Sequence, residues 1–204
     1  YFCAVLVPAM MGGRTARNVG KAARQAIDPE RDFRNAMRAL EDTPTVGNRM
    51  KIAQAAAALG RWSDAEAQWA LAAEGHWADD PAVLKGHAEA LLELGRYDDA
   101  LKRLEQLRAL GSEGATPQVA LLFARAYEGL GRNEEADDAF RFAADRVPGL
   151  ESGARYVAFM AKTGRREDAE IGFGEIERRY SKISPQLRGE ARIWRDLAAK
   201  ALGR

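Results

Sequence analysis

A short motif occurs four times along this chain, at residues 60–65, 95–100, 131–136 and 164–169. Each copy contains glycine, arginine, two variable residues, an acidic residue and alanine, and the glycines are 35, 36 and 33 residues apart. One helical hairpin cannot bury its apolar face until neighbouring hairpins stack on it, so this period is typical of a helical-hairpin solenoid. The sequence therefore predicts an all-α fold of about four helix-turn-helix units.

The residues around each motif resemble the tetratricopeptide repeat, a helix-turn-helix unit that builds protein-binding superhelices. Seven positions before each glycine the family places a small residue at the helix crossing, and this chain has Ala53, Ala88, Ala124 and the larger Val157. Nine positions after each glycine the family places a large apolar residue, and this chain has Trp69, Leu104, Phe140 and Phe173. The resemblance covers residues 46–180 and implies a right-handed superhelix of about four repeats with a capping helix at each end.

Elementary packing accounts for the same pattern. Small side chains at the crossing let two helix backbones approach, and the bulky residue one turn later fills the space beside them. The glycine supplies a left-handed residue that ends the first helix, and the acids that follow face the positive end of the second helix. Helices are expected at residues 46–59, 62–75, 81–94, 97–110, 117–130, 133–146, 150–163 and 166–180.

An amphipathic helix is expected before the repeats, within residues 28–45. Asp28 and Pro29 mark its start, because aspartate caps helix N-termini and proline is tolerated in the first turn. Its apolar face, by helical spacing, comprises Phe33, Ala36, Met37 and Leu40.

A second amphipathic helix is expected within residues 181–204, beginning at Ser184 and Pro185. A terminal helix of this kind covers the open end of a solenoid and keeps it soluble. We expect it to lie on the second helix of the fourth repeat, with three side chains facing inward: Leu187, Ala191 and Trp194.

Charge is strongly segregated along the chain. Residues 1–12 are uncharged and mostly apolar, and residues 1–27 carry four basic side chains and no acid: Arg14, Arg17, Lys21 and Arg24. A bilayer span needs ~20 apolar residues, so this stretch predicts the end of a longer membrane segment with a basic cytoplasmic flank. The repeats would then be membrane-anchored and cytoplasmic. The alternative is an N-terminal amphipathic helix packed on the solenoid.

A second resemblance concerns the same region. The segment from Tyr1 to Arg31 resembles a junction found in some bacterial tetratricopeptide proteins. In those proteins a membrane module precedes the repeats, and the module is similar to the N-terminal region of cardiolipin-synthase-like phospholipase D proteins. This resemblance implies a bacterial membrane protein. It also implies an alternative role as a regulatory or positioning module of a phospholipid-metabolising membrane enzyme.

Composition argues against several other function classes. Residues 28–177 carry a net charge of −9 and residues 178–204 a net charge of +6, so the repeats lack the clustered basic residues that nucleic acid requires. The one cysteine, Cys3, excludes an internal disulfide, and no cysteine or histidine spacing matches a zinc site. The sequence contains no phosphate-binding loop and no hydrolase or metalloprotease motif. We therefore expect no catalytic residues, no metal and no cofactor.

The resemblance implies a concave groove lined by the first helix of each repeat. The residues at these positions are Met50, Gln54, Lys85, Glu89, Leu121, Arg125, Ala154, Arg155 and Ala158. The clamp for chaperone C-terminal carboxylates requires basic and asparagine residues, and this chain lacks them, having Met50, Gln54, Gly86, Gln118 and Leu122 instead. Lys85, Glu89 and Arg125 are compatible with peptide contact and equally with an ordinary solvated face.

The sequence thus predicts a noncatalytic protein–protein interaction scaffold. It would bind a peptide or a helix of another protein in the groove, on a preformed surface. The identity of the partner, the oligomeric state and the possibility that the chain's own terminus occupies the groove stay open at this point.

Overall fold

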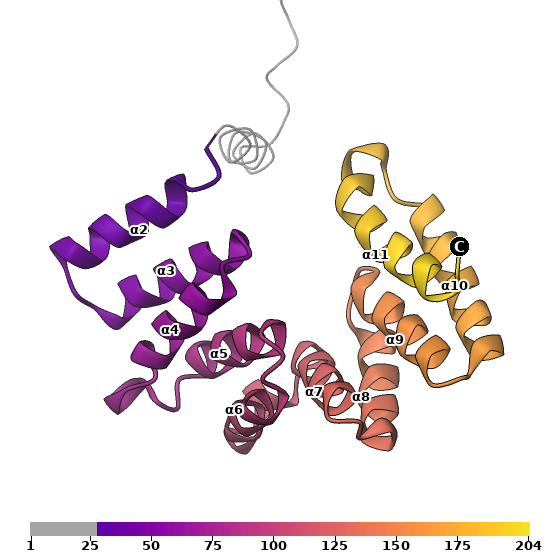
Figure 1. The fold of residues 1–204 in the computed structure, drawn as a ribbon, viewed down its shortest axis with the longest axis horizontal. Helices are drawn as coiled ribbons and strands as arrows, with labels where there is room; N and C mark the ends of the chain where they lie inside the picture. The colour runs from indigo at the N-terminus through magenta and orange to yellow at the C-terminus, as the bar shows by residue number, and fades with distance from the viewer. Residues whose placement is uncertain (1–27) are drawn as a thin grey trace, which may run out of the picture. The chain divides into compact units, whose positions relative to one another are not determined.

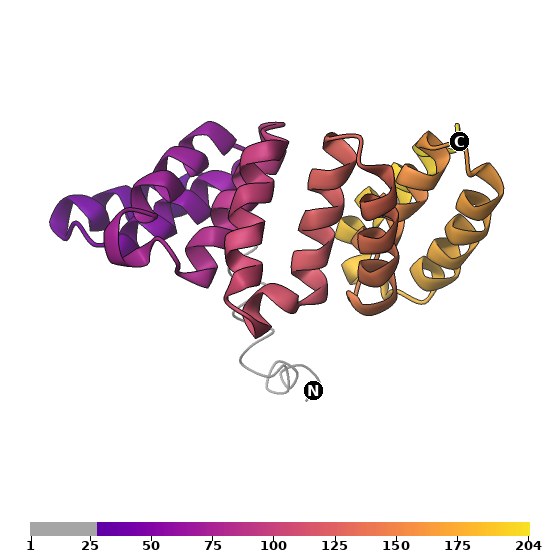
Figure 2. The ribbon, with the colours of Figure 1, turned by 90° about the horizontal axis from the view of Figure 1, so that it is seen from below.

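The computed structural model describes residues 28–204, which divide into two compact units between Leu71 and Ala72. Every regular element in these described residues is helical (Figures 1 and 2). The prediction of an all-α helical-repeat fold is confirmed. The apolar and basic segment of residues 1–27, with its predicted membrane contact, lies outside the described residues.

The first unit contains the helices α2 (Arg31–Asp42), α3 (Val46–Ala58) and α4 (Trp62–Ala72). Asn48 ties α3 to the end of α2, because its side-chain amide donates to the carbonyls of Ala39 and Thr43, both at 2.9 Å. Thr45 caps α3 by accepting from the Asn48 N–H.

Two expectations for the N-terminal helix need correction. The helix begins at Arg31, because residues 28–31 close a turn in which the Arg31 N–H donates to the Asp28 carbonyl. The Asp28 carboxylate therefore pairs with Arg34 and does not cap the helix. On the apolar face only Ala36 is buried, and Met37 is exposed, since it lies about 100° around the helix from Ala36.

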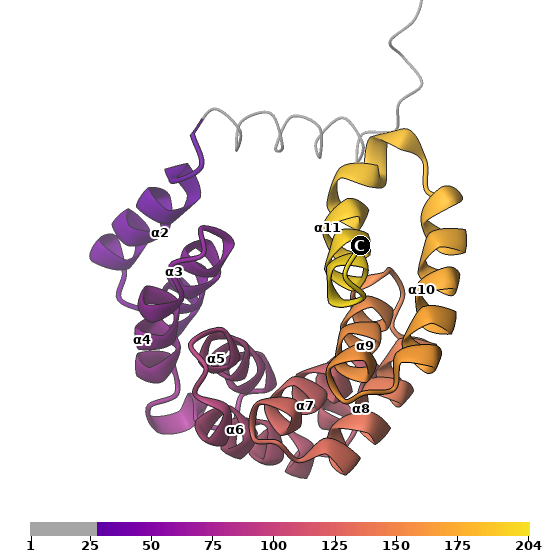
Figure 3. The ribbon, with the colours of Figure 1, turned by 45° about the vertical axis from the view of Figure 1, so that its right-hand side comes forward.

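The second unit contains seven α-helices, with short 3₁₀ turns at Gly75–Trp77, Ser112–Ala115 and Pro185–Leu187. The helices are α5 (Pro81–Glu93), α6 (Tyr97–Ala109), α7 (Pro117–Gly129), α8 (Asn133–Arg146), α9 (Glu151–Lys162), α10 (Arg166–Ser181) and α11 (Arg188–Ala201). In Figure 3 the first helices α5, α7 and α9 form an inner row and the second helices α6, α8 and α10 an outer row. The helices α5, α7 and α9 therefore form one side of this unit.

Each repeat turn has the same backbone geometry. The motif glycines have positive φ, from 71° at Gly60 to 85° at Gly164, which is the left-handed conformation predicted for the helix end. The N–H of the following arginine returns to a carbonyl of the first helix, as in the 2.9 Å bond from Arg96 to Leu91. This pair of features is the Schellman ending of a helix.

The core consists of the positions that the repeat pattern marks. All four motif alanines are fully buried, and so are the small residues at the helix crossings except Val157, which is 2% exposed. The large residues Leu104 and Phe140 are also fully buried, and Trp69 and Phe173 nearly so. Close packing of small against large side chains thus holds each hairpin together.

The C-terminal helix α11 packs on both helices of the last hairpin. Ala198, Ala199 and Leu202 are buried in one cluster with residues of α9 and α10, and Ala191 and Trp194 pack at its edge. The helix was expected on the second helix of the fourth repeat, α10, and it lies against the first helix, α9, as well (Figures 1 and 3). The side chain of Leu187 lies outside the described ones.

Candidate binding face of the first helices

Four charged residues of the predicted groove lie on the first helices of the second unit. Lys85 and Glu89 are one turn apart on α5, Arg125 is on α7, and Arg155 is on α9. We call the surface that carries them the first-helix face. Two of its three helices begin at side-chain caps, since the Asp80 carboxylate accepts from two N–H groups of α5 and the Thr116 hydroxyl from one of α7.

Ion pairs join neighbouring helices along this face. Arg125 of α7 reaches Glu93 of α5 at 2.6 Å, and Arg125 is only 16% exposed. Lys162 of α9 reaches Glu128 of α7 at 3.0 Å. Within α9, Arg155 pairs with Glu151 at 2.9 Å. The face therefore carries a row of opposite charges, two of whose pairs join neighbouring first helices.

Glu89 has a long ion pair on the first-helix face. Its ion pair with Lys85 is long, at 3.9 Å. Partial burial raises the pKa of Glu89 above its ordinary value, against the opposing effect of Lys85 and Arg125. The nearby carboxylates of Glu151 and Glu93 raise the pKa further. The Glu89 carboxylate thus sits where its negative charge is poorly stabilised.

Two other predicted groove residues belong to the core. Leu121 is 7% exposed and Ala154 is fully buried, each within a cluster of apolar side chains. They fill the space beneath the charged side chains and offer little surface to a partner. Ala158 is half-buried on α9.

Arg155 is covered by the C-terminal helix. Its guanidinium carbon lies 4.9 Å from the centre of the Trp194 ring, within range of a cation–π contact. The chain's own terminus therefore occupies the α9 end of the first-helix face. The remaining part of the first-helix face lies on α5 and α7 and carries Lys85, Glu89 and Arg125.

A cleft of about 540 Å³ lies beside Lys85, between the start of α5, the end of α6 and the start of α7. Leu107 and Val119, which are nearly fully buried, form its floor. Asp80, Glu113 and Gln118 are among its polar lining residues. The cleft can accept a small apolar group next to a charged rim.

The remaining groove positions lie in the first unit. Met50 is half-buried and Gln54 is exposed on α3. Gln54 lines a cleft of about 430 Å³ between α2 and α3, with Asp32, Lys51 and other residues. These two residues are thus placed beside the N-terminal helix.

The motif arginines have a role that the sequence analysis missed. Each pairs with the acid three residues later: Arg61 with Asp64, Arg96 with Asp99, Arg132 with Glu135, and Arg165 with Asp168. Hydrogen bonds from Lys102 and Arg96 lower the pKa of Asp99. In every copy of the motif the acid follows the arginine by three residues, and this spacing indicates the ion pairs. In the sequence analysis the acids were explained by the helix dipole.

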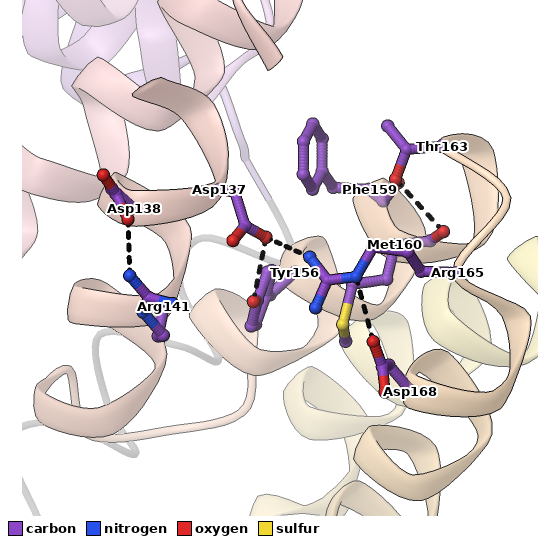
Figure 4. Close-up of polar contacts among 9 residues, drawn as sticks. All are labelled: Asp137, Asp138, Arg141, Tyr156, Phe159, Met160, Thr163, Arg165 and Asp168. Carbon is purple, nitrogen blue, oxygen red and sulfur yellow. Dashed lines mark hydrogen bonds and ion pairs between the residues drawn. The ribbon is translucent and has the colours of Figure 1, made fainter. Parts of the chain in front are cut away.

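A partly buried polar cluster links α8, α9 and the start of α10 (Figure 4). The Tyr156 hydroxyl donates to the Asp137 carboxylate at 2.9 Å, and the Arg165 guanidinium pairs with the same carboxylate. Arg165 also binds Asp168 at 2.9 Å. Partial burial raises the pKa of Tyr156. These contacts join consecutive repeats.

The two histidines occupy different environments. His87 is buried on α5, and His76 is exposed in the turn before α5. Within residues 28–204 no group of three or more His, Cys, Asp or Glu side chains could hold a metal ion. No helix in that range has the length and apolar character needed to span a bilayer.

Two solved structures are similar in fold to this chain. One is MamA, residues 41 to the end, from Desulfovibrio magneticus RS-1, with a TM-score of 0.65, 20% identity, and coverage of 85% of this chain and 99% of that chain. The other is TTC0263, a thermophilic TPR protein of Thermus thermophilus, with a TM-score of 0.67, 15% identity, and coverage of 94% of this chain and 97% of that chain. This chain therefore has the tetratricopeptide-repeat fold, as the sequence resemblance implied.

Comparison of the sequence with family models gave no match, and comparison with curated proteins gave none.

Proposed function

We propose that this tetratricopeptide-repeat chain is a noncatalytic interaction module that binds a peptide or a helix of another protein on its first-helix face. The observation that carries the proposal is the convergence of side chains from successive first helices, with Lys85 and Glu89 on α5 beside Arg125 on α7. The Glu93–Arg125 pair holds part of this surface in place before any partner arrives. A preformed surface of this kind lowers the ordering cost of binding.

The position of α11 limits where the partner would bind. The C-terminal helix covers Arg155, so the accessible part of the face lies on α5 and α7, next to the cleft beside Lys85. A partner segment would therefore contact fewer repeats than the sequence pattern alone suggests.

Site-specific photo-crosslinking tests the proposed function. A photoreactive amino acid is placed at Gln118, an exposed residue at the cleft, and in a matched protein at Asp138, an exposed residue of the outer helix α8. In a lysate of the source cells the Gln118 probe should capture a defined protein and the Asp138 probe should not. Capture at both positions to the same extent, or at neither, would contradict binding on this face.

We also propose that residues 1–27 attach the module to a bacterial membrane, with the repeats on the cytoplasmic side. The support is the sequence order of an apolar stretch, four basic residues and an acidic repeat region. Each Lys or Arg near an anionic surface contributes ~1 kcal/mol. In the complete protein, protease added outside intact cells should leave the repeats uncut until the membrane is opened; cleavage from outside would reverse the orientation.

A further inference from the structure

We propose that Glu89 determines the specificity of the first-helix face by receiving a lysine or arginine side chain of the bound segment. This inference rests on the proposed function and adds the chemical class of the partner: a basic segment of a protein. It assigns Glu89 a direct role in recognition and Arg125 a supporting one.

The first argument is that the arginines of the face already have close acidic partners and Glu89 has no comparable cation. Arg125 is 2.6 Å from Glu93, and Arg155 is 2.9 Å from Glu151. Among the residues that the structure describes, the one cation in ion-pair range of Glu89 is Lys85, at 3.9 Å. That separation exceeds the length of a charge-assisted hydrogen bond, so the Glu89 carboxylate retains its capacity to accept one.

The second argument concerns Lys85, which a partner's cation can displace. The Lys85 side chain is 43% exposed and shares a helix face with Glu89 at the (i, i+4) spacing. Exposed pairs of this type contribute little to stability, so exchanging Lys85 for a better-placed cation costs little. Lys85 therefore marks the position that a lysine or arginine of the partner would take.

The third argument is charge complementarity. The Glu93 and Glu151 carboxylates make the surroundings of Glu89 more negative, and they contribute to its raised pKa. A cation from the partner would stabilise ionised Glu89, whereas an acidic side chain placed against the same carboxylate would be repelled. Residues 28–177 as a whole carry a net charge of −9, which would accelerate encounter with a basic segment.

The neighbouring cleft adds an apolar requirement. Lys85 lines this cleft, whose floor is Leu107 and Val119, and Glu89 follows one helical turn later. One turn is about 5.4 Å, and two residues of an extended strand span about 6.6 Å. The preferred segment therefore has an apolar side chain about two residues from its lysine or arginine.

Selection from a phage-displayed library of random dodecapeptides tests the inference. The full chain is compared with Glu89→Gln, Glu89→Lys and the control Glu134→Gln, which changes an exposed acid on the outer helix α8. The unmodified chain and the control should enrich peptides with Lys or Arg at one aligned position, and Glu89→Lys should lose that preference or replace it with Asp or Glu. A synthetic peptide from the first selection should bind Glu89→Gln at least about tenfold more weakly.

Three results would overturn the inference, and thermal melts first establish that each variant is folded. Selected peptides that crosslink at Gln118 but show no Lys or Arg preference would refute the role of Glu89 and leave binding on this face intact. Equal affinity of the selected peptide for the unmodified chain and Glu89→Gln would do the same. Enriched peptides that crosslink equally at Gln118 and Asp138, or no enrichment at all, would count against both proposals.

Discussion

Arg155 of α9 lies beneath the indole ring of Trp194 of α11, with its guanidinium carbon 4.9 Å from the ring centre. This contact places the C-terminal helix on a surface that the repeat pattern assigns to ligand binding. Arg195 and Arg204 of the same segment pair with Glu177 and Glu170 of α10, at 2.6 and 2.7 Å. The terminal helix thus bridges both helices of the last hairpin.

Removal of residues 184–204 should lower the melting temperature and the solubility, because it exposes the apolar surface that Ala198, Ala199 and Leu202 cover. The point substitution Leu202→Ala, at a side chain 2% exposed, should cost ~2 to 5 kcal/mol. Ile193→Ala provides the control, since Ile193 is 64% exposed on α11 and Leu202 directly follows that helix. Urea denaturation measures all three; an equally stable truncation would show that α11 does not cap the fold.

Overpacking at the motif alanines should be strongly destabilising. Ala100 and Ala136 are fully buried at the helix contact, so Ala100→Leu or Ala136→Leu should cost ~1 to 3 kcal/mol. The exposed neighbour Glu134 offers a control, because Glu134→Gln should change stability by less than ~0.5 kcal/mol. Similar small shifts in all three thermal melts would mean that the repeat register is wrong.

Ser152→Ala should stabilise the protein. The Ser152 hydroxyl is fully buried and has no hydrogen-bond partner, at the position where the preceding repeat has Val119. Removing an unsatisfied buried hydroxyl should raise the free energy of unfolding by ~1 kcal/mol. Ser63→Ala, at an exposed residue of the first turn of α4, should have no comparable effect. A loss of stability in Ser152→Ala, measured by urea denaturation, would indicate that the hydroxyl has a partner.

Adjacent aspartates on α8 should differ in their contribution to stability. Asp137 is 24% exposed and holds both Tyr156 and Arg165, whereas Asp138 is 74% exposed and pairs with Arg141 alone (Figure 4). Asp137→Ala should cost ~1 to 3 kcal/mol, because it removes hydrogen bonds to a charged group. Asp138→Ala should cost less than ~0.5 kcal/mol. Equal losses in chemical denaturation would show that the inter-repeat cluster contributes nothing beyond a surface pair.

Glu89→Gln should stabilise the fold at neutral pH, and the gain should shrink in acid. Partial burial raises the pKa of Glu89 above 4.5, so in the intervening pH range the folded state binds more protons than the unfolded state. The contribution of Glu89 to the free energy of unfolding is therefore present in full below pH 4.5, and it is lost as pH rises through the folded-state pKa. Urea denaturation at several pH values measures the free energy of unfolding of Glu89→Gln and of the unmodified chain. The difference between the two free energies should grow from acid to neutral pH. A pH-independent difference would contradict the raised pKa.

Periodicity alone determined the helices, their turns and most of the core. The alanines at the crossings, the large residues one turn later and the left-handed glycines are local requirements of a stacked hairpin, so they can be identified without knowing where any neighbour lies. The placement of Lys85, Glu89 and Arg125 on successive first helices followed from the same period. Even there, the sequence could not show that Leu121 and Ala154 pack into the core, because burial depends on the neighbouring helices.

Only the tertiary structure decided how the charges are paired and what covers the first-helix face. Arg125 meets Glu93 from a different repeat, 32 residues away, and no spacing within one helix predicts that contact. The course of α11 is set by the width of its apolar face, which fits the surface of both α9 and α10 and brings Trp194 onto Arg155. Local sequence determines helix formation through short-range hydrogen bonds and packing, whereas pairing between repeats depends on distances that exist only after the helices have stacked.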